Sequence, residues 1–355
     1  MKIEVQEINK FSVWDDFLYR QCPWNYFQLW DYGEVQKLLG AKVLRIGLIK
    51  NKEMIGQSQI FIVRAKRGNF LQIKHGPVLT IKATKNDVLF YLKKLKRIAG
   101  ENGCLFIRIN PLVEGKKSIF WQRLGFLPSP IHNMDAEICL KIDLLQNEEK
   151  ILSLMRKTNR NLIRKARKLG VVVCKGAGKI QLTLFLKLFY KSANRKGFIT
   201  HRGIEEEFNI FKKRKKVLIF LSKYGKDVLS GAFVTFTRNQ AVYRHGGTAD
   251  ILTNIPASYL LQWEIIKEAK RRKMKIYNLW GITKESDKSH PWHGFTQFKK
   301  GFGGEVYEYL HSMDLPLSKK YCFTRFIELS IKVVRGYQKV LFFRSPYWLR
   351  GLFGV

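Results

Sequence analysis

Two stretches of the chain, far apart in sequence, repeat the same pattern of apolar and polar positions. Residues 42–64 and residues 216–238 each consist of an apolar run, a polar turn and a second apolar run, rich in β-branched and aromatic side chains. This pattern predicts a β-hairpin in each stretch. A third apolar run follows each hairpin and ends in a glycine-rich turn, at residues 75–77 and at residues 245–247.

The two halves continue alike beyond these turns. Each shows an amphipathic helical pattern, a further short strand and a closing segment similar to F-x-Q-x-x-x-G-F. The spacing from Gly56 to Gly125 equals the spacing from Gly231 to Gly301 to within one residue. We therefore predict an internal duplication of one α/β unit, built on a mixed sheet with helices on its faces. A chance likeness between two mixed α/β segments is the alternative.

The repeat divides the chain into three blocks. We expect one α/β unit in residues 1–145, a second in residues 146–315 and a C-terminal block in residues 316–355. In that last block, apolar side chains fall on one helical face and basic side chains on another. Aromatic residues such as Tyr347 and Trp348 among arginines are typical of a membrane interface. The alternative is that this block packs back on the first unit, and both interpretations are compatible.

A helical pattern at residues 149–169 joins the two predicted units. Its apolar stripe consists of Met155, Leu162, Ala166 and Leu169, and a second stripe consists of Arg156, Arg160, Arg164 and Arg167. Gly170 is well placed to end this helix. Because hardly any acidic residue follows Arg156 before residue 175, the arginines lack ion-pair partners along the helix and repel one another. Such a stripe predicts an anionic partner, and a solvated helix face is the alternative.

Charge strengthens the case for an anionic partner. The 355 residues include 65 Lys and Arg but only 28 Asp and Glu, which gives a formal net charge of +37. A field of this size favours RNA, DNA, an anionic membrane surface or a pyrophosphate-bearing substrate. Five scattered cysteines, a start without an apolar signal segment and no apolar run of membrane-spanning length predict a cytoplasmic protein.

Few catalytic motifs fit the chain. His290 and His293 form an H-x-x-H pair, but no nearby acid or thiol completes a zinc set, so no metal is expected. There is no P-loop and no G-x-S-x-G nucleophile elbow. A hairpin-led α/β unit resembles the acyl-CoA N-acyltransferase (GNAT) fold, whose members bind CoA through a Q/R-x-x-G-x-G/A loop. Neither half contains that loop, which favours an acyl donor whose carrier group is not CoA.

Nine short motifs, in order along nearly the whole chain, carry a resemblance to a known family. They are FQLWDYGEVQK (27–37), KHGPV (74–78), FIRINP (106–111), WQRLGF (121–126), RKTNRNLIRKA (156–166), YRHGGT (243–248), PASYLLQWE (256–264), NLWGI (278–282) and FKKGFGG (298–304). With them the chain resembles the FemABX peptidyltransferases, which build the interpeptide bridges of peptidoglycan. The resemblance implies two tandem GNAT-like domains of mixed α/β structure without a long coiled-coil arm. It also implies aminoacyl-tRNA as donor, a peptidoglycan precursor as acceptor and no cofactor.

The resemblance further implies roles for particular residues. An ester on tRNA is already activated, so catalysis requires that the acceptor amine reach the carbonyl and that the developing oxyanion be stabilised. The family assigns that task to the lysine of an F-K motif, here Lys299 after Phe298. The matching acceptor-side positions are Gln36 with Lys37, Asn110 and Arg202, with Tyr243 and Trp280 as cleft walls, and Phe298 is expected to contact the substrate as well. Gln36 stands where the family has a lysine, and Asn110 where it has an aspartate.

We expect a monomer that works at the inner face of the cell membrane, with the four arginines of the junction helix on tRNA or lipid phosphates. The transferred amino acid would be glycine, alanine or serine, and the acceptor lipid II or its nucleotide-linked form. Two other functions stay open from the sequence. One is a CoA-dependent N-acyltransferase acting on a polysaccharide, and the other is a non-catalytic RNA-binding protein, which explains the charge but not the FKKGFGG context.

Overall fold

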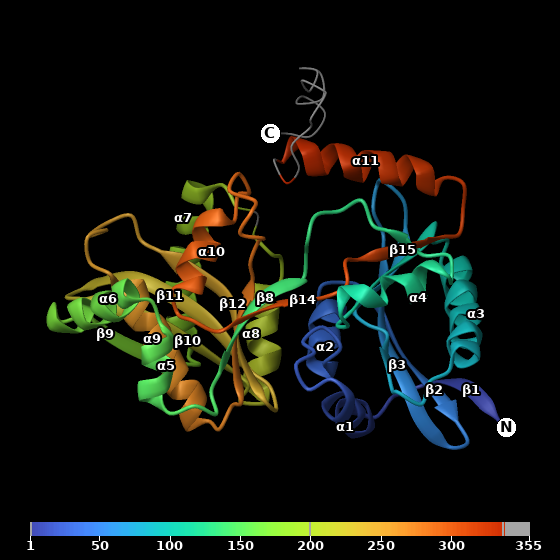
Figure 1. Cartoon of the computed structure of the whole chain (residues 1–355), viewed down its shortest axis with the longest axis horizontal. Helices are drawn as coiled ribbons and strands as arrows, with labels where there is room; N and C mark the ends of the chain where they lie inside the picture. Colours follow the sequence, from blue (N-terminus) through green and yellow to red (C-terminus); the bar gives the residue numbers. More distant parts are fainter. Residues whose placement is uncertain (1, 199, 336, 338–355) are drawn as a thin grey trace.

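Two mixed β-sheets form the framework of the molecule in the computed structural model, which describes residues 2–198, 200–335 and 337 (Figure 1). The first sheet has the strand order β1-β2-β3-β4-β6-β15-β7, with β5 paired to β3. Its strands are β1 (Ile3–Glu7), β2 (Lys42–Lys50), β3 (Glu53–Val63), β4 (Phe70–His75), β5 (Val78–Leu79), β6 (Phe106–Pro111), β7 (Leu127–Pro128) and β15 (Met313–Pro316). Its helices are α1 (Phe11–Gln21), α2 (Trp30–Leu38), α3 (Lys85–Glu101) and α4 (Ser118–Gln122), with a 3-10 turn at Gly115–Lys117.

The second sheet has the order β14-β8-β13-β12-β11-β10-β9. Its strands are β8 (Ile138–Asp143), β9 (Val172–Gly176), β10 (Val217–Tyr224), β11 (Asp227–Phe236), β12 (Gln240–Thr248), β13 (Ile276–Gly281) and β14 (Glu305–Glu308). The remaining helices are α5 (Glu148–Leu154), α6 (Lys157–Lys168), α7 (Lys179–Lys196), α8 (Ile204–Lys213), α9 (Ala257–Arg271), α10 (His293–Lys300) and α11 (Tyr321–Val334). Within the described ranges, no helix is long and apolar enough to cross a membrane.

The two sheets share one strand order, which confirms the predicted mixed α/β class. Read from β1 in the first sheet and from β9 in the second, three antiparallel pairings are followed by one parallel pairing and then by two antiparallel ones. The predicted hairpins are β2–β3 and β10–β11. The helix that follows the third strand is α3 in the first half and α9 in the second.

Each sheet contains one strand that lies outside the run of its other strands along the chain: β15 in the first sheet and β8 in the second. β8 precedes the second half's own strands but lies between β13 and β14, and β15 follows them but lies between β6 and β7. The two insertions are equivalent, because each strand takes the same position in its sheet. The division of the chain at residues 145 and 315 stays a prediction. The strand pairing shows that β8 and β15 each complete a sheet whose other strands lie elsewhere along the chain.

A hydrophobic cluster also joins the halves. Phe17, Tyr26, Phe27 and Tyr32 from the first half pack in one buried cluster with side chains of α7, α8 and β10–β12. Separate clusters lie between the first sheet and α3 and between the second sheet and α6 and α9. Burial of large aromatic side chains dominates the stability of such contacts.

The predicted continuous helix at residues 149–169 is wrong, because two helices, α5 and α6, occupy it. Met155 and Arg156 between them have extended backbone conformations. The Arg156 amide donates to the carbonyl oxygen of Gly301 at 3.0 Å, and Asn159 packs so closely on Gly301 that a side chain there would collide with it. The inward face of α6 is Asn159, Ile163 and Ala166, whereas Leu169 is exposed. Gly170 ends the helix with a positive φ, as expected.

The C-terminal helix α11 lies on the first sheet through a buried ionic network. Arg108 of β6 donates two hydrogen bonds, at 2.7 and 2.8 Å, to the carboxylate of Asp314 on β15. The same guanidinium reaches Glu328 of α11 at 2.6 Å, and Arg67 reaches Glu328 at 2.8 Å. Figure 1 shows α11 running across this end of the molecule. The tail residues Tyr347 and Trp348 lie outside the described residues.

We predict that Asp314→Ala lowers the free energy of unfolding by about 3–5 kcal/mol, because it strips a buried guanidinium of its main partner. Urea denaturation measures this loss. The matched control is Glu53→Ala, whose pair with Lys82 is solvent-exposed and is worth at most about 1 kcal/mol. Equal losses for the two variants would show that the buried network does not hold β15 in place.

Candidate functional site

The parallel strand pair is closed in the first sheet and opens in the second. β4 and β6 pair over their whole length, Phe70–His75 with Phe106–Pro111. The equivalent strands β12 and β13 pair only from Gln240 to Val242 and from Ile276 to Asn278. Beyond these residues β12 continues along β11 and β13 along β8, so the facing edges of β12 and β13 are not joined to each other.

Trp280 marks the point where the strands separate. Its φ of 66° lies in the left-handed region, which a bulky residue rarely adopts. Its amide donates to the side-chain oxygen of Asn278 at 2.9 Å, and the β13–β8 register shifts between Asn278 and Gly281. This local twist turns Trp280 away from the strand ladder.

Lys299 reaches the opened end of β13. Its Nζ donates to the carbonyl oxygen of Gly281 at 2.6 Å, and the side chain is buried. Burial lowers the pKa of Lys299 to about 7, with only the neighbouring Cys139 thiol acting in the other direction. No carboxylate pairs with Lys299 among the described residues. Lys300, in contrast, forms an ion pair with Glu285 at 2.8 Å.

Helix α10 holds Lys299 in this position. Thr296, fully buried, accepts from the Thr283 amide at 3.0 Å and donates to the Trp292 carbonyl at 2.9 Å. On another face of α10, Phe298 packs against Tyr259 and Phe302 in edge contacts. The structure thus places Phe298 as a support of the helix that carries Lys299, and its substrate contact stays a prediction.

The Trp280 ring joins a buried cluster of aromatic and cationic side chains between the two halves. It meets the rings of Tyr26 and Phe27 at 5.6 Å, and the guanidinium of Arg244 lies 4.6 Å from its ring centre. Arg244 pairs with Glu207 at 3.0 Å, and the Tyr26 hydroxyl donates to the same carboxylate at 2.6 Å. Burial alone would raise the pKa of Glu207, but the Arg244 charge acts together with the hydrogen bonds from Arg244 and Tyr26 and lowers this pKa to about 2.

The duplication places a second, half-buried cation in this cluster. Lys74 and His75 occupy the end of β4, as Arg244 and His245 occupy β12. Lys74 pairs with Asp135 at 3.0 Å and lies 4.9 Å from the Phe27 ring. His75 Nδ1 and His245 Nε2 are buried without a hydrogen-bond partner. Burial lowers the pKa of His75 to about 4 and of His245 to about 3, which keeps both rings neutral.

Sequence reasoning missed this cluster as part of the site. The matched K-H-G-P and R-H-G-G motifs were a usable signal, because they mark equivalent positions on β4 and β12 in the two halves. Asn110, by contrast, was predicted, and its side-chain oxygen accepts from the His75 amide at 3.0 Å. Asn110 therefore fixes the backbone at the end of β4.

Three other residues predicted to bind the acceptor, Gln36, Lys37 and Arg202, lie near one another in the two halves. Gln36 and Lys37 lie near the end of α2, where Lys37 is exposed and pairs with Glu34 at 3.2 Å. Arg202 is exposed before α8, and the adjacent Gly203 packs on Leu39, which follows α2. The structure thus brings the ends of these two predicted segments together from opposite halves.

Tyr243 lies away from that group, on the opened part of β12. Its side chain packs tightly beside Gly246, and a side chain at Gly246 would collide with the hydroxyl. Burial raises the pKa of Tyr243 to about 12. Its role as a cleft wall stays a prediction.

The four arginines of the predicted tRNA-binding stripe have different surroundings. Arg160 caps α5 by donating to the Met155 carbonyl at 2.6 Å, and Arg167 lies 3.6 Å from Glu264. Arg164 is exposed, and Arg156 donates to the Gln297 side chain of α10 at 3.3 Å. Arg156, at one end of the stripe, therefore contacts α10, the helix that carries Lys299.

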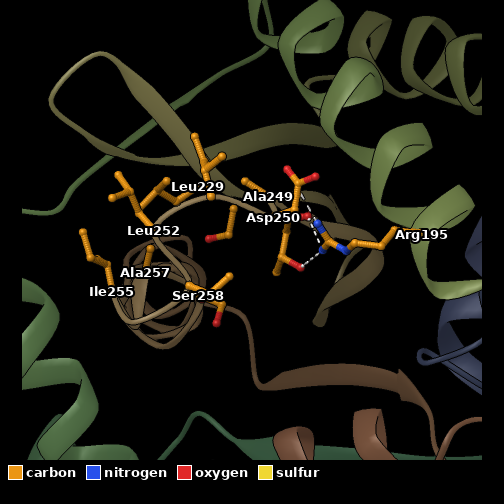
Figure 2. Close-up of a pocket in the computed structure, with 12 residues that line it drawn as sticks. Arg195, Leu229, Ala249, Asp250, Leu252, Ile255, Ala257 and Ser258 are labelled. Atoms are coloured by element: carbon orange, nitrogen blue, oxygen red, sulfur yellow. Dashed lines mark hydrogen bonds and ion pairs between the residues drawn. The ribbon is translucent and has the colours of Figure 1, made fainter.

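A cavity of about 430 Å³ lies where β12 ends and α9 begins. Figure 2 shows Arg195 directed towards Asp250 at its rim, and Arg195 also donates to the Thr248 carbonyl at 2.9 Å. Ser230 and Ser258 contribute polar groups, whereas none of the predicted site residues lines the cavity. In the described parts of the chain, no group of His, Cys, Asp and Glu could hold a metal ion.

Comparison with known proteins decides the family. The model of the FemAB family matches residues 11–119, 131–205 and 201–329. The chain belongs to the FemAB family. Aminoacyltransferase FemA of Staphylococcus aureus (strain MW2) is 30% identical over 91 residues, which is 26% of this chain and 22% of that protein. The chain thus matches about a fifth of the length of this curated FemAB relative.

Solved structures confirm the predicted tandem GNAT-like fold. A crystal structure of FemX matches with a TM-score of 0.79 at 19% identity, covering 92% of this chain and 100% of that one. A tandem GNAT protein from the clavulanic acid biosynthesis pathway matches at 0.58 and 8% identity, with 89% and 98% coverage. L-PGS from Bacillus licheniformis matches at 0.55 and 10% identity, with 92% and 98% coverage.

The buried Lys299 predicts a characteristic dependence of stability on pH. Its pKa is about 7 in the folded protein against 10.5 when exposed, so the folded state binds fewer protons between these values. The wild-type protein therefore loses stability as pH falls from 10 to 7. We predict that Lys299→Met stabilises the protein more at pH 6 than at pH 9, by on the order of 2–3 kcal/mol. Urea titrations at both pH values measure this, with Lys300→Met as control; an equal effect at both pH values contradicts it.

Proposed function

We propose that the chain is an aminoacyltransferase that moves an amino acid from aminoacyl-tRNA to the stem peptide of a peptidoglycan precursor. The observation that carries the proposal is the buried Lys299 at the opened end of the second sheet, which pairs with no carboxylate of the described residues. Membership of the FemAB family and the name of the FemA relative support the reaction class. The amino acid would be glycine, alanine or serine.

The opened strand pair is the proposed place of the reacting ester. Unpaired backbone groups on the facing edges of β12 and β13 can bind an extended acyl group by strand-like hydrogen bonds. The cavity at the end of β12 gives room for the part of the donor beyond that group. With the ester carbonyl near Gly281, the ammonium of Lys299 would face the carbonyl oxygen.

Transfer then proceeds by direct attack. The acceptor amine nitrogen attacks the ester carbonyl carbon, a C–N bond forms and negative charge develops on the carbonyl oxygen. The bond to the ribose oxygen breaks, and that oxygen leaves with the proton that the amine gives up. Lys299 stabilises the charged intermediate more than the neutral ester, which lowers the barrier.

The donor distinguishes this proposal from the two alternatives. A CoA-dependent enzyme needs a phosphate-binding amide loop, and residues 248–258, TADILTNIPAS, which run from the end of β12 to the start of α9, lack that motif. Measured CoA binding would favour that alternative. A non-catalytic RNA-binding protein would not need the buried Lys299. An assay of amino-acid transfer from charged tRNA to lipid II tests this alternative directly.

We predict that Lys299→Met lowers turnover about 100- to 1000-fold, or by about 2.7–4 kcal/mol in barrier, with little change in substrate binding. Radiolabelled transfer from charged tRNA at saturating substrates measures it. Lys300→Met, which removes only the ion pair to Glu285, serves as the control and should act mildly. Normal turnover of Lys299→Met would assign the oxyanion to another group.

We predict that tRNA binding depends on the exposed arginines of α6 and its N-terminal end. Arg156→Gln with Arg164→Gln should reduce the slope of log K against log salt by roughly 1.4–1.8, since each lost phosphate contact contributes about 0.7–0.9. Filter binding across a salt series measures the slope. Lys93→Gln with Lys96→Gln on α3 is the charge-matched control. Identical slopes for the two double variants would show that the stripe is an ordinary solvated face.

A further inference from the structure

Helix α11 has an inner face that is fully used by the first sheet. Tyr321, Thr324 and Glu328 are its buried residues. The Tyr321 hydroxyl donates to Asp314 at 2.8 Å, and the Thr324 hydroxyl donates to the Arg67 carbonyl. Glu328 accepts from both Arg67 and Arg108. These contacts fix which side of the helix points outwards.

The outer face of α11 is apolar. Phe323 and Phe326 are each 66% exposed, and Leu329 is 38% exposed. Three large apolar side chains at spacings of three residues form one continuous stripe along the helix. Folding buries little of this stripe, although the opposite side of the same helix is tightly docked.

The exposed charges described next to this stripe have one sign. Glu328 is the only acid between residue 317 and the C-terminus, and it faces inwards. Burial raises the pKa of Glu328, but hydrogen bonds from Arg108 and Arg67 outweigh this and lower it, so its charge is neutralised inside. Among the described residues, the exposed charged groups at the ends of α11 are Lys319, Lys320 and Arg335. Lys66, in the loop that contacts Thr324, is exposed as well.

We infer that the outer face of α11 docks on an anionic lipid surface. An apolar stripe with a cationic rim is the pattern of a helix lying in the headgroup layer, where aromatic rings enter the interface and lysines meet lipid phosphates. A second copy of this chain would bring an identical cationic rim to the contact, so its charges would repel. Charge complementarity therefore selects the anionic membrane.

The end of α11 lies next to the segment that begins α10. The Tyr337 ring stacks on His132 at 3.8 Å and lies 5.4 Å from His290 and 6.3 Å from Trp292. Trp292 is the residue before α10, and its carbonyl holds Thr296. A membrane-bound α11 therefore brings the helix of Lys299 close to the lipid surface. If the proposed function holds, this position near the membrane favours a lipid-linked acceptor over a nucleotide-linked one.

Vesicle sedimentation of the full chain tests the docking. Wild-type protein should bind vesicles of phosphatidylglycerol and phosphatidylcholine and bind pure phosphatidylcholine much more weakly. Phe323→Ser with Phe326→Ser should weaken binding to the anionic vesicles about ten-fold or more. Ile81→Ser with Ile180→Ser, which alters two exposed side chains elsewhere, is the matched control and should leave binding unchanged. Lys319→Gln with Lys320→Gln should weaken binding and reduce its salt dependence.

Transfer assays separate this inference from the proposed function. The phenylalanine double variant should lose transfer to a lipid-linked acceptor in vesicles but keep transfer to the soluble nucleotide-linked form. Wild-type protein that binds vesicles through α11 yet transfers to neither acceptor would refute the proposed function and support the docking. Unchanged vesicle binding by the double variant overturns the docking. So does a wild-type dimer that this variant converts to monomer, or binding that is lost only when residues 338–355 are removed.

Discussion

The buried pair of Arg108 and Asp314 is the interaction on which the rest of the structure depends. It joins a central strand of the first sheet to a strand that the chain supplies only after the second sheet is complete. A guanidinium removed from water is stable only when its donors are satisfied, and here two carboxylates satisfy them from two different elements. The same contact therefore fixes β15, places α11 and ties the end of the second half to the first.

The duplicated halves keep one topology but divide the tasks. In the first sheet the parallel strands stay paired over six residues, which leaves no opening at that point. In the second they pair over three, and Trp280 turns into the contact between the halves. Equivalent cations, Lys74 and Arg244, both lie near the Phe27 ring, each with its own carboxylate. The first half thus lacks the strand opening that the second half provides.

The sequence predicts what local pattern determines and misses what distant contacts determine. The hairpins, the helices after them and the stop at Gly170 follow from periodicity and glycine chemistry. The break between α5 and α6 depends on Gly301, far along the chain, and helical periodicity continues across it. The strand exchange has no local signal, because nothing in the short sequences of β8 and β15 indicates which sheet they join. Lys299 was found from its motif, whereas its burial and lack of a carboxylate required the structure.

The absence of a carboxylate next to Lys299, within the part of the chain described, has a physical consequence for catalysis. A lysine paired with an acid keeps its charge, but the acid neutralises that charge equally in the ground state and in the transition state. Of the residues described, only Gly281 accepts a hydrogen bond from Lys299, through its carbonyl oxygen, and burial makes the ammonium form costly. An oxyanion beside it would relieve that cost only when the negative charge develops. Such a lysine interacts more strongly with the transition state than with the neutral ester, which is the condition for raising turnover rather than affinity.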